Sequence, residues 1–455
     1  MKILIAGCGK VGSTLTKLLT SEGHEITLID RNPEILESIM ERYDVMGVQG
    51  NAATMESLEQ AGVENADLLI AATDMDEVNL LSCLTAHGLN EKLHTIGRIR
   101  NPEYRHQAFE MRSVFGLNMV INPEQEAASS ISRLLKYPGF RTIETFAKGN
   151  VEIVEVHVTA DSKLKNVALN QLQNIIHRTV LVCAIVRDDK CLMPDGHFVL
   201  KENDHLYITA TTSNLSALLR SLGMITKPVK NVLIAGGGRI SYYLASQLQE
   251  SGMACEIIEQ KASRCQELAL LLPEARIVQG DASNQNFMET ERIDSYDALV
   301  MLTGLDELNI VMSLYGSARG VKHVVTKVSH GENNLLLNEL EIGSVVSPKE
   351  LSCNTIVQYV RAMQNRQGAA ISIHRIADGQ AEAIEFMIDE NSKYIGEKVK
   401  NLHLKKNILI SSISRGENTE IASGNSSYEL NDTVVIITNH SNPILQFNDI
   451  FEAEF

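Results

Sequence analysis

Six residues near the start of the chain have the types and spacing to bind a phosphate group. They form the pattern glycine-x-glycine-x-x-glycine directly after the apolar run KILIA, and they are Gly7, Cys8, Gly9, Lys10, Val11 and Gly12. Such glycines permit a tight turn and a close approach of backbone to pyrophosphate, and the following helix N-terminus offers free N–H groups to the anion. Alone the pattern is weak, because glycine turns kept only for packing are common.

An acid stands where a ribose would need one. Asp30 ends the second apolar run, EITLID, about twenty residues after the glycines, where a carboxylate binds both hydroxyls of an adenosine ribose. This favours NAD(H), ATP or ADP over NADP(H), although the adjacent Arg31 is a cation that could accept a 2′-phosphate. Strand, glycines, helix and acid together predict a nucleotide site, and a turn kept for packing is the alternative.

The same residue types recur 229 positions later (236 − 7). They are Gly236, Gly237, Gly238, Arg239, Ile240 and Ser241, with Glu259 as the acid. Ser241 replaces the third glycine, which sits where helix and strand pack closely. This second site therefore binds the same ligand, a different adenine nucleotide or nothing.

Other candidate residues follow the remaining apolar runs, at what would be the carboxyl ends of strands, where doubly wound sheets bind ligands. They are Asn51, Ala52, Thr73, Asp74 and Arg98 in the first set, and Asp281 and Thr303 in the second. Arg98 and Arg100 either neutralise a pyrophosphate or form surface ion pairs. Asp76 and Asp306 begin helices, and either cap them or contact a ligand or partner.

These residues recur because the chain is an internal duplication. KILIAG at 2–7 corresponds to NVLIAG at 231–236, and QGNA at 49–52 corresponds to QGDA at 279–282. Near the end of each half, ENDHLYITA at 202–210 corresponds to LNDTVVIIT at 430–438. NPEQEAASSI at 122–131 corresponds to SPKELSCNTI at 347–356. An offset that stays at 225 to 230 over such a distance (347 − 122 and 279 − 49) indicates two tandem copies.

Each copy predicts a larger α/β part and a smaller α+β part. In the larger part, short β-branched runs alternate with amphipathic stretches, which is typical of right-handed βαβ units and a doubly wound, Rossmann-like parallel sheet. The smaller part is β-rich, with a helix expected over 165–173 and hairpin turns at RDDK and RGEN. The predicted domains are Rossmann-like at 1–138 and 227–367, and small α+β at 139–226 and 368–455.

Composition narrows the class of protein. The net charge of −16 argues against nucleic acid and against direct binding to anionic lipid as partners, because both need clustered Lys and Arg. No apolar run approaches the roughly 18–20 residues that span a bilayer, and the charged, glycine-rich start does not resemble a signal peptide. Seven scattered cysteines without a CxxC pair favour a reducing cytoplasm.

The sequence shows no recurring set of residues that would catalyse a reaction. A nicotinamide-dependent oxidoreductase, the competing class, needs a substrate domain with an acid or base, whereas the small parts share only Lys163 with Lys393 and the turn residues Asp204 with Asp432. Neither metal-ligand spacing nor a P-loop occurs, and the histidines of the first small part have no counterparts in the second, namely His157, His177, His197 and His205. We expect a binding protein with no catalytic residues, no metal site and no enzymatic activity.

The motifs resemble the family that regulates the conductance of potassium, the RCK or KTN domains. The resemblance rests on GCGKVG with Asp30, QGNA, AATDMDEVN at 71–79, RIRNPEY at 98–104 and INPEQ at 121–125, and it covers essentially the whole chain. It implies that the small parts are RCK-C domains. It also implies a cytoplasmic protein, held at the inner face of the membrane by a potassium-translocating membrane subunit of the Trk type. Members assemble as homo-oligomeric rings whose shape changes with nucleotide binding and gates the pore.

The resemblance also implies which ligands and residues to expect. NAD⁺ or NADH is the first choice of ligand and ATP or ADP the second, and the residues named above would line the site. Cyclic di-AMP binds the RCK-C domains of some relatives, but no residue spacing in this chain indicates such a site. The chain departs from the family at Asn51, where Asp is frequent, and the second copy has Gly304 for Asp74 and Lys327 for Arg98. A cytosolic nucleotide sensor without a membrane partner is the alternative function.

Overall fold

The computed structural model divides the chain into two units, Met1–Ala128 with Ser347–Val357, and Ser129–Val346 with Gln358–Phe455. The described residues are 1–138, 140, 142–146, 150–176, 179–222, 227–329, 340, 342–363, 370–416, 418–439, 444 and 446–452. From the sequence we expect joints around Pro138–Gly139, Lys227–Pro228 and Gln367–Gly368. Gly139 and Gln367–Gly368 lie outside the described residues, as does His177, whereas Lys227–Pro228 lies within them. The four-part division of the chain therefore stays a prediction.

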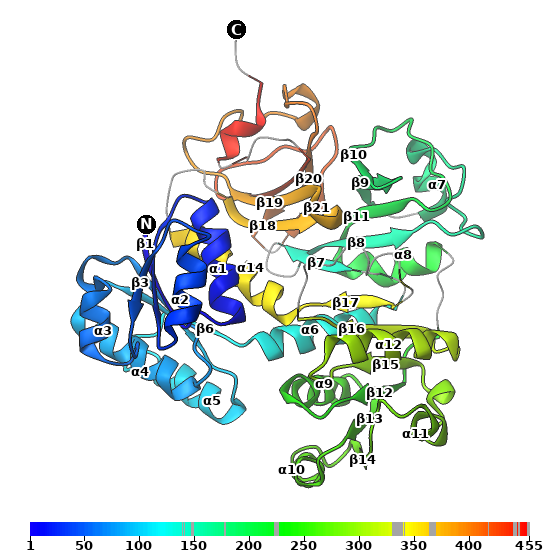
Figure 1. The fold of residues 1–455 in the computed structure, drawn as a ribbon. Coiled ribbons are helices and arrows are strands. Elements are labelled where there is room, and N and C mark those ends of the chain that lie inside the picture. Colours follow the sequence, from blue (N-terminus) through cyan, green and yellow to red (C-terminus); the bar gives the residue numbers. More distant parts are fainter. Residues whose placement is uncertain are drawn as a thin grey trace. The chain divides into compact units, whose positions relative to one another are not determined.

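Unit 1, whose first 128 residues are drawn in shades of blue to cyan in Figure 1, contains a parallel sheet of six strands. Their order is β3-β2-β1-β4-β5-β6. Its strands are β1 Lys2–Ala6, β2 Glu25–Asp30, β3 Met46–Gln49, β4 Leu68–Ala71, β5 His94–Arg98 and β6 Met119–Ile121. Strand β1 pairs with β2 and with β4, so Ile5 lies between Leu28 and Ile70. All three side chains are buried, as a sheet covered on both faces requires. The prediction of a doubly wound sheet is confirmed, and the order in which the strands are added reverses between β1 and β4.

The helices of unit 1 connect these strands. They are α1 Lys10–Ser21, α2 Pro33–Met40, α3 Met55–Gln60, α4 Asp76–Leu89, α5 Pro102–Glu110 and the first part of α6 Pro123–Lys136. Side chains of Asn32 and Asn101 cap α2 and α5, each followed by a proline at the first helical position. Unit 1 also contains Ser347–Val357, the start of α14 Pro348–Met363, so residues of the second repeat pack with the first Rossmann-like sheet.

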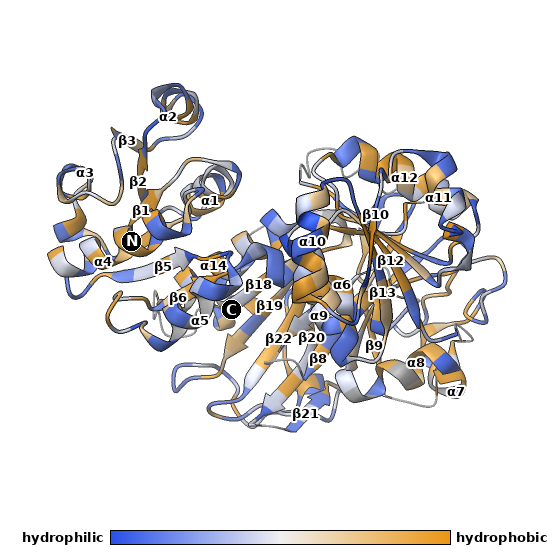
Figure 2. Ribbon diagram, turned by 90° about the horizontal axis from the view of Figure 1, so that it is seen from below, coloured by the Kyte–Doolittle hydropathy of each residue, from blue (hydrophilic) through white to orange (hydrophobic). Residues whose placement is uncertain are grey.

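Unit 2 contains a second parallel sheet in the order β14-β13-β12-β15-β16-β17. Its strands are β12 Asn231–Ala235, β13 Ala254–Glu259, β14 Arg276–Gln279, β15 Ala298–Met301, β16 His323–Lys327 and β17 Ser344–Val346. The helices between them are α9 Arg239–Glu250, α10 Ala262–Leu271, α11 Gln285–Thr290 and α12 Asp306–Ala318. Strands β12 and β13 are strongly hydrophobic (Figure 2), and the strand order repeats that of unit 1, so the duplication extends to the fold.

Unit 2 also contains two small antiparallel sheets, in the orders β10-β9-β11-β8-β7 and β18-β19-β22-β20-β21. The first has β7 Ile143–Phe146, β8 Val151–His157, β9 Leu181–Arg187, β10 Lys190–Leu192 and β11 His205–Thr211, with helices α7 Gln173–Ile176 and α8 Leu215–Ser221. The second has β18 Ala370–Ile376, β19 Ala381–Met387, β20 Ile408–Arg415, β21 Asn418–Ile421 and β22 Thr433–Thr438. Reading the second order backwards reproduces the first, which confirms two copies of one small fold.

The helix expected over 165–173 is wrong. Turns occupy its start, and only a 3₁₀ helix at Leu169–Gln171 and the short α7 follow. The backbone N–H of Asn166 donates to Leu200, and that of Leu169 donates to Phe198, so hydrogen bonds to a distant segment replace those of a helix. The hairpin turn expected at RDDK is confirmed, because Asp188 and Asp189 both have positive φ between β9 and β10. The turn expected at RGEN lies partly outside the described residues.

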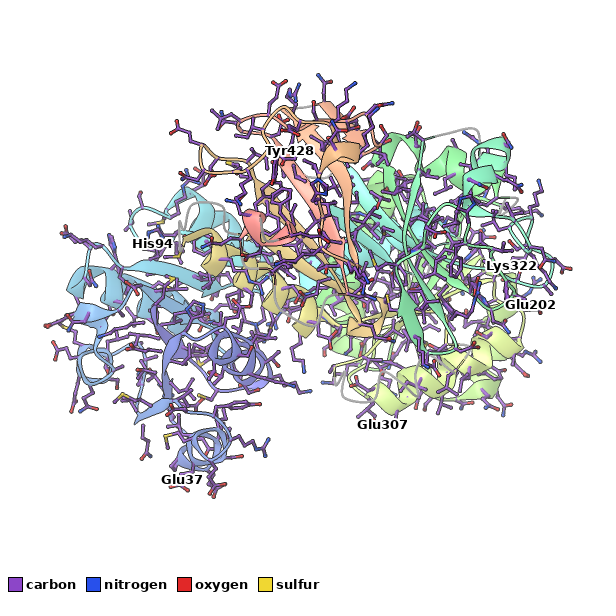
Figure 3. All side chains as sticks on the ribbon, turned by 90° about the horizontal axis from the view of Figure 1, so that it is seen from above. Glu37, His94, Glu202, Glu307, Lys322 and Tyr428 are labelled. Atoms are coloured by element: carbon purple, nitrogen blue, oxygen red, sulfur yellow. The ribbon has the colours of Figure 1, made fainter. Side chains whose placement is uncertain are left out.

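The small sheets share one hydrophobic cluster. It contains Phe146, Val151, Ile153 and Tyr207 from the first and Ile376, Ala383, Val435 and Ile437 from the second, among others. Each also has its own core, and in the second the buried Tyr428 (labelled in Figure 3) donates a hydrogen bond to the carbonyl of Lys393 at 2.7 Å. Within the described part of the chain, no helix combines the length and apolar character needed to cross a bilayer.

Candidate nucleotide sites

The first glycine turn joins β1 to α1 and leaves the helix N-terminus open. Gly7 has a φ of +94°, and a Cβ there would lie 2.8 Å from the backbone of Thr73. A Cβ on Gly12 would lie 1.9 Å from the Gly7 carbonyl oxygen, whereas one on Gly9 would meet nothing within 4 Å. Helix α1 has no side-chain cap, so the N–H groups of its first turn are available to an anion.

The acid at the end of the second strand is tied to the glycine turn. The Asp30 carboxylate accepts hydrogen bonds from the backbone N–H groups of Cys8, at 2.6 Å, and Asn32, at 2.9 Å. In the second repeat, Glu259 accepts from Gly237 and Lys261, both at 2.8 Å. The carboxylate in each repeat therefore lies beside the turn, where the prediction places a ribose.

A threonine and an asparagine join the ends of β4 and β5. The Thr73 hydroxyl and backbone N–H both donate to the Asn79 side chain, at 2.7 and 2.8 Å, and the Asn79 amide donates to the Arg98 carbonyl oxygen. The carboxylate of Asp76, buried at the start of α4, accepts from the backbone N–H groups of Arg100 and Asn101. This role is neither of the two considered for Asp76, because its hydrogen bonds connect the start of α4 to the segment after β5.

Arg98 ends β5, and its side chain is only 14% exposed. Its closest carboxylate is that of Glu124, with 3.8 Å between Nη2 and Oε1. Among the described residues, Arg98 Nε and Glu124 Oε2 are buried without a hydrogen-bond partner. Burial lowers the pKa of the Arg98 guanidinium. Arg98 is therefore a largely buried cation with an incomplete ion pair, and not part of a surface pair.

The other predicted residues of the first site lie at the same edge of the sheet. Ala52 is buried, while the Asn51 side chain accepts from the backbone N–H of Ala53. Lys10 and Asp74 are exposed. The carboxyl ends of the five strands β1 to β5 thus carry all the predicted residues of this site, and β1 and β4 are adjacent in the sheet, the usual place for a ligand in a doubly wound fold.

The second site keeps the turn but uses its polar groups differently. Gly236 has a φ of +101°, and the hydroxyl of Ser241, which replaces the third glycine, donates to the Gly236 carbonyl oxygen. The Lys327 ammonium donates to the Thr303 carbonyl oxygen at 2.6 Å. Lys327 therefore has a partner within the protein at the position where Arg98 has only a distant carboxylate.

Two more residues distinguish the second site. The Arg264 Nε donates to the Gly237 carbonyl oxygen at 2.7 Å, at a position where the first repeat has Ile35 (264 − 229). The Asp281 carboxylate accepts from the hydroxyl and N–H of Ser283, which lowers its pKa. Sequence reasoning did not name Arg264, although the replacement of Ile35 by a cation in the repeat alignment was a usable signal.

Two doubly wound sheets with glycine turns, each followed in the sequence by a small antiparallel sheet, define a tandem Rossmann-like protein. The TrkA-N domain family matches residues 3–123 and 232–348, and the TrkA-C domain family matches residues 153–223 and 383–452. The chain therefore belongs to the TrkA family, which confirms the resemblance read from its motifs.

A curated potassium-uptake protein and solved RCK structures are similar to the chain over nearly its whole length. It is 30% identical over 459 residues to the Trk system potassium uptake protein TrkA of Haemophilus influenzae, covering 99% of both chains. The solved GsuK RCK domain has a TM-score of 0.63 at 18% identity, with 96% of this chain and 92% of that one covered. The GsuK channel bound to NAD has a TM-score of 0.62 at 19% identity, with 96% and 76% covered. At these identities the structures support the fold alone.

Proposed function

We propose that this chain is the regulatory subunit of a Trk-type potassium-uptake system and that its first Rossmann-like domain binds an adenine nucleotide. The observation that carries the proposal is Arg98, a largely buried arginine at the carboxyl end of β5 whose buried Nε has no hydrogen-bond partner among the described residues. A buried cation without a full set of partners is unfavourable. A pyrophosphate held by the glycine turn and the α1 N-terminus would supply the missing acceptors.

The proposed ligand is NAD⁺ or NADH, with ADP or ATP as the second choice. Asp30 beside the glycine turn favours a ribose with both hydroxyls free, because a 2′-phosphate would meet a carboxylate. In solved structures of similar fold, GsuK is bound to NAD in one and to ADP in another. These observations support an adenine nucleotide without choosing between a dinucleotide and a mononucleotide, and they offer no support for cyclic di-AMP.

The chain acts by binding and not by catalysis in this proposal. Its relatives are named as potassium-uptake proteins, and the partner is an integral-membrane, potassium-translocating subunit beneath which copies of this chain assemble in the cytoplasm as a ring. NAD⁺ and NADH, or ADP and ATP, differ in charge. A ligand shifts the equilibrium between two conformations of the protein only as far as its affinities for those two conformations differ.

A thermal-unfolding screen tests the nucleotide site directly. NAD⁺, NADH, NADP⁺, ATP, ADP and AMP would be added to the purified chain, and a ligand at 100 times its Kd should stabilise the folded state by about 2.7 kcal/mol. We expect stabilisation by NAD⁺, NADH or ADP and little by NADP⁺. The absence of stabilisation by every nucleotide would contradict the proposal.

Potassium uptake tests the regulatory role. Deleting the gene should reduce potassium-dependent growth at low external potassium, and the wild-type chain should restore it. Nucleotide binding without any effect on potassium uptake would instead indicate a sensor that works without a membrane partner.

A further inference from the structure

Two carboxylates at the start of α6 connect the first site to a helix of the second repeat. Glu124 faces Arg98, and Glu126, two residues on, accepts a hydrogen bond from the Ser352 hydroxyl of α14 at 2.7 Å. Ser352 is fully buried, and burial raises the pKa of Glu126. The adjacent Cys353 is also fully buried, and its thiol contacts the carbonyl oxygen of Val11, in the first turn of α1, at 3.8 Å.

The ion pair between Arg98 and Glu124 is poorly satisfied on both sides. Its atoms are 3.8 Å apart, both side chains are less than one fifth exposed, and each has a further buried polar atom without a partner among the described residues. Partly buried pairs of this kind gain little, because their desolvation is not offset by good hydrogen bonds. A phosphate oxygen that reached Arg98 would therefore replace a weak partner with a stronger one.

The second repeat serves as an internal comparison. At an offset of 225, Glu124 and Glu126 correspond to Lys349 and Leu351 (349 − 124 and 351 − 126). The residues of the first repeat that correspond to Ser352 and Cys353 are Ala127 and Ala128 (352 − 225 and 353 − 225). At these aligned positions the two acids occur only on α6, and Ser352, which donates to Glu126, occurs only on α14.

We propose that Glu124 is a built-in competitor for the first nucleotide site, occupying Arg98 until a ligand phosphate displaces it. This inference rests on the proposed nucleotide binding. It adds how occupancy of that site changes the conformation of α6 and α14. Displacement of Glu124 disturbs the first turn of α6, and the hydrogen bond between Glu126 and Ser352 passes the disturbance to α14. Both helices continue beyond unit 1, at Ala128 and at Val357, so the change reaches segments that leave the first domain.

Glu124→Gln tests the competition, since it keeps the shape and removes the charge. In calorimetry, ADP should bind this variant about fivefold more tightly than it binds the wild type, from the roughly 1 kcal/mol of such an ion pair. Adenosine, which carries no phosphate, should bind both equally. Glu64→Gln is the matched control, because Glu64 is exposed and precedes β4 at the opposite edge of the sheet, and it should leave ADP affinity unchanged.

Hydrogen exchange tests the transmission. Saturating ADP should accelerate amide exchange over residues 347–357 in the wild type. Ser352→Ala should bind ADP and lose this acceleration. Unchanged ADP affinity in Glu124→Gln, or exchange over 347–357 that ADP does not alter in the wild type, overturns the inference while nucleotide binding itself stands. Failure of the wild type to bind any nucleotide overturns the proposed function as well.

Discussion

Replacing the Asp30 carboxylate tests the ribose end of the first site. Its two hydrogen bonds from the backbone of Cys8 and Asn32 use two of the roughly four lone-pair positions of a carboxylate. About two remain, which is the number that the hydroxyls of a ribose require. Asp30→Asn keeps the size of the side chain, removes its charge and replaces one acceptor oxygen by a donor.

The expected loss follows from the two hydroxyl contacts. A hydrogen bond to a charged group contributes about 1.5–3 kcal/mol. Because Asp30 is only half-buried, we use the lower value for each contact. Two contacts then give about 3 kcal/mol, or roughly a hundredfold weaker binding of ADP to Asp30→Asn.

Calorimetry with ADP and 2′-deoxy-ADP separates a ribose contact from general damage. The wild type should prefer ADP by roughly tenfold, the value of one hydroxyl contact, and Asp30→Asn should show no preference. Thermal unfolding checks that the variant is folded, and Glu259→Gln, the matching change in the second repeat, should keep the preference at the first site. An Asp30→Asn chain that still prefers ADP tenfold would refute the placement of the ribose.

Four further predictions concern two glycines of the first turn, an arginine of the second repeat and a buried acid. Gly9→Ala should leave the unfolding temperature unchanged, because the added Cβ meets nothing within 4 Å, yet weaken ADP binding in calorimetry by crowding the pyrophosphate. Gly12→Ala would place its Cβ 1.9 Å from a carbonyl oxygen and should lower stability by about 1–3 kcal/mol in denaturant unfolding. Arg264→Ile copies Ile35 of the first repeat, removes the hydrogen bond to the Gly237 carbonyl oxygen and should lower stability by about 1 kcal/mol in denaturant unfolding. Burial raises the pKa of Glu126 above its ordinary 4.5, so the protonated form favours folding and this stability is lost as pH rises above that value. Glu126→Gln should therefore raise the unfolding temperature at pH 7, with the gain disappearing below about pH 4.5.

Local pattern was sufficient for the parallel sheets. Runs such as KILIA are too short for a buried helix and too apolar for a half-exposed strand, so they predict strands covered on both faces, and Ile5 is indeed fully buried. The small sheets were harder. Strands β7 and β18 lie at sheet edges, where one neighbour holds them and the pattern is weaker, and the stretch at 165–173 has helical composition but bonds its backbone to residues near 200.

The hydrogen-bond partners of the candidate residues could not be predicted from the sequence. Asp204 does occupy a turn, accepting from the N–H of Lys201, but it is also fully buried and forms two hydrogen bonds with Arg187, both at 2.7 Å. Asp432 makes the corresponding pair with Arg415. Such partners lie on another strand, so only the folded sheet brings them together. The same holds for Glu126 and Ser352, which are 226 residues apart in the chain.

Duplication within one chain explains why the acids and their partners occur on different helices. In a dimer of identical subunits, one helix sequence has to fill both roles. It would need the acids at the positions of Glu124 and Glu126, and also the side chains at the positions of Ser352 and Cys353 that contact the neighbouring domain. Here α6 carries Glu124 and Glu126, whereas α14 carries Ser352 and Cys353 and has Lys349 and Leu351 at the acid positions. The second site correspondingly has Lys327, whose ammonium is bonded to a backbone carbonyl. The two repeats have therefore diverged in complementary ways, and the changes in the second repeat are those expected of a domain that lends a helix to the first site while losing the acid pair from its own.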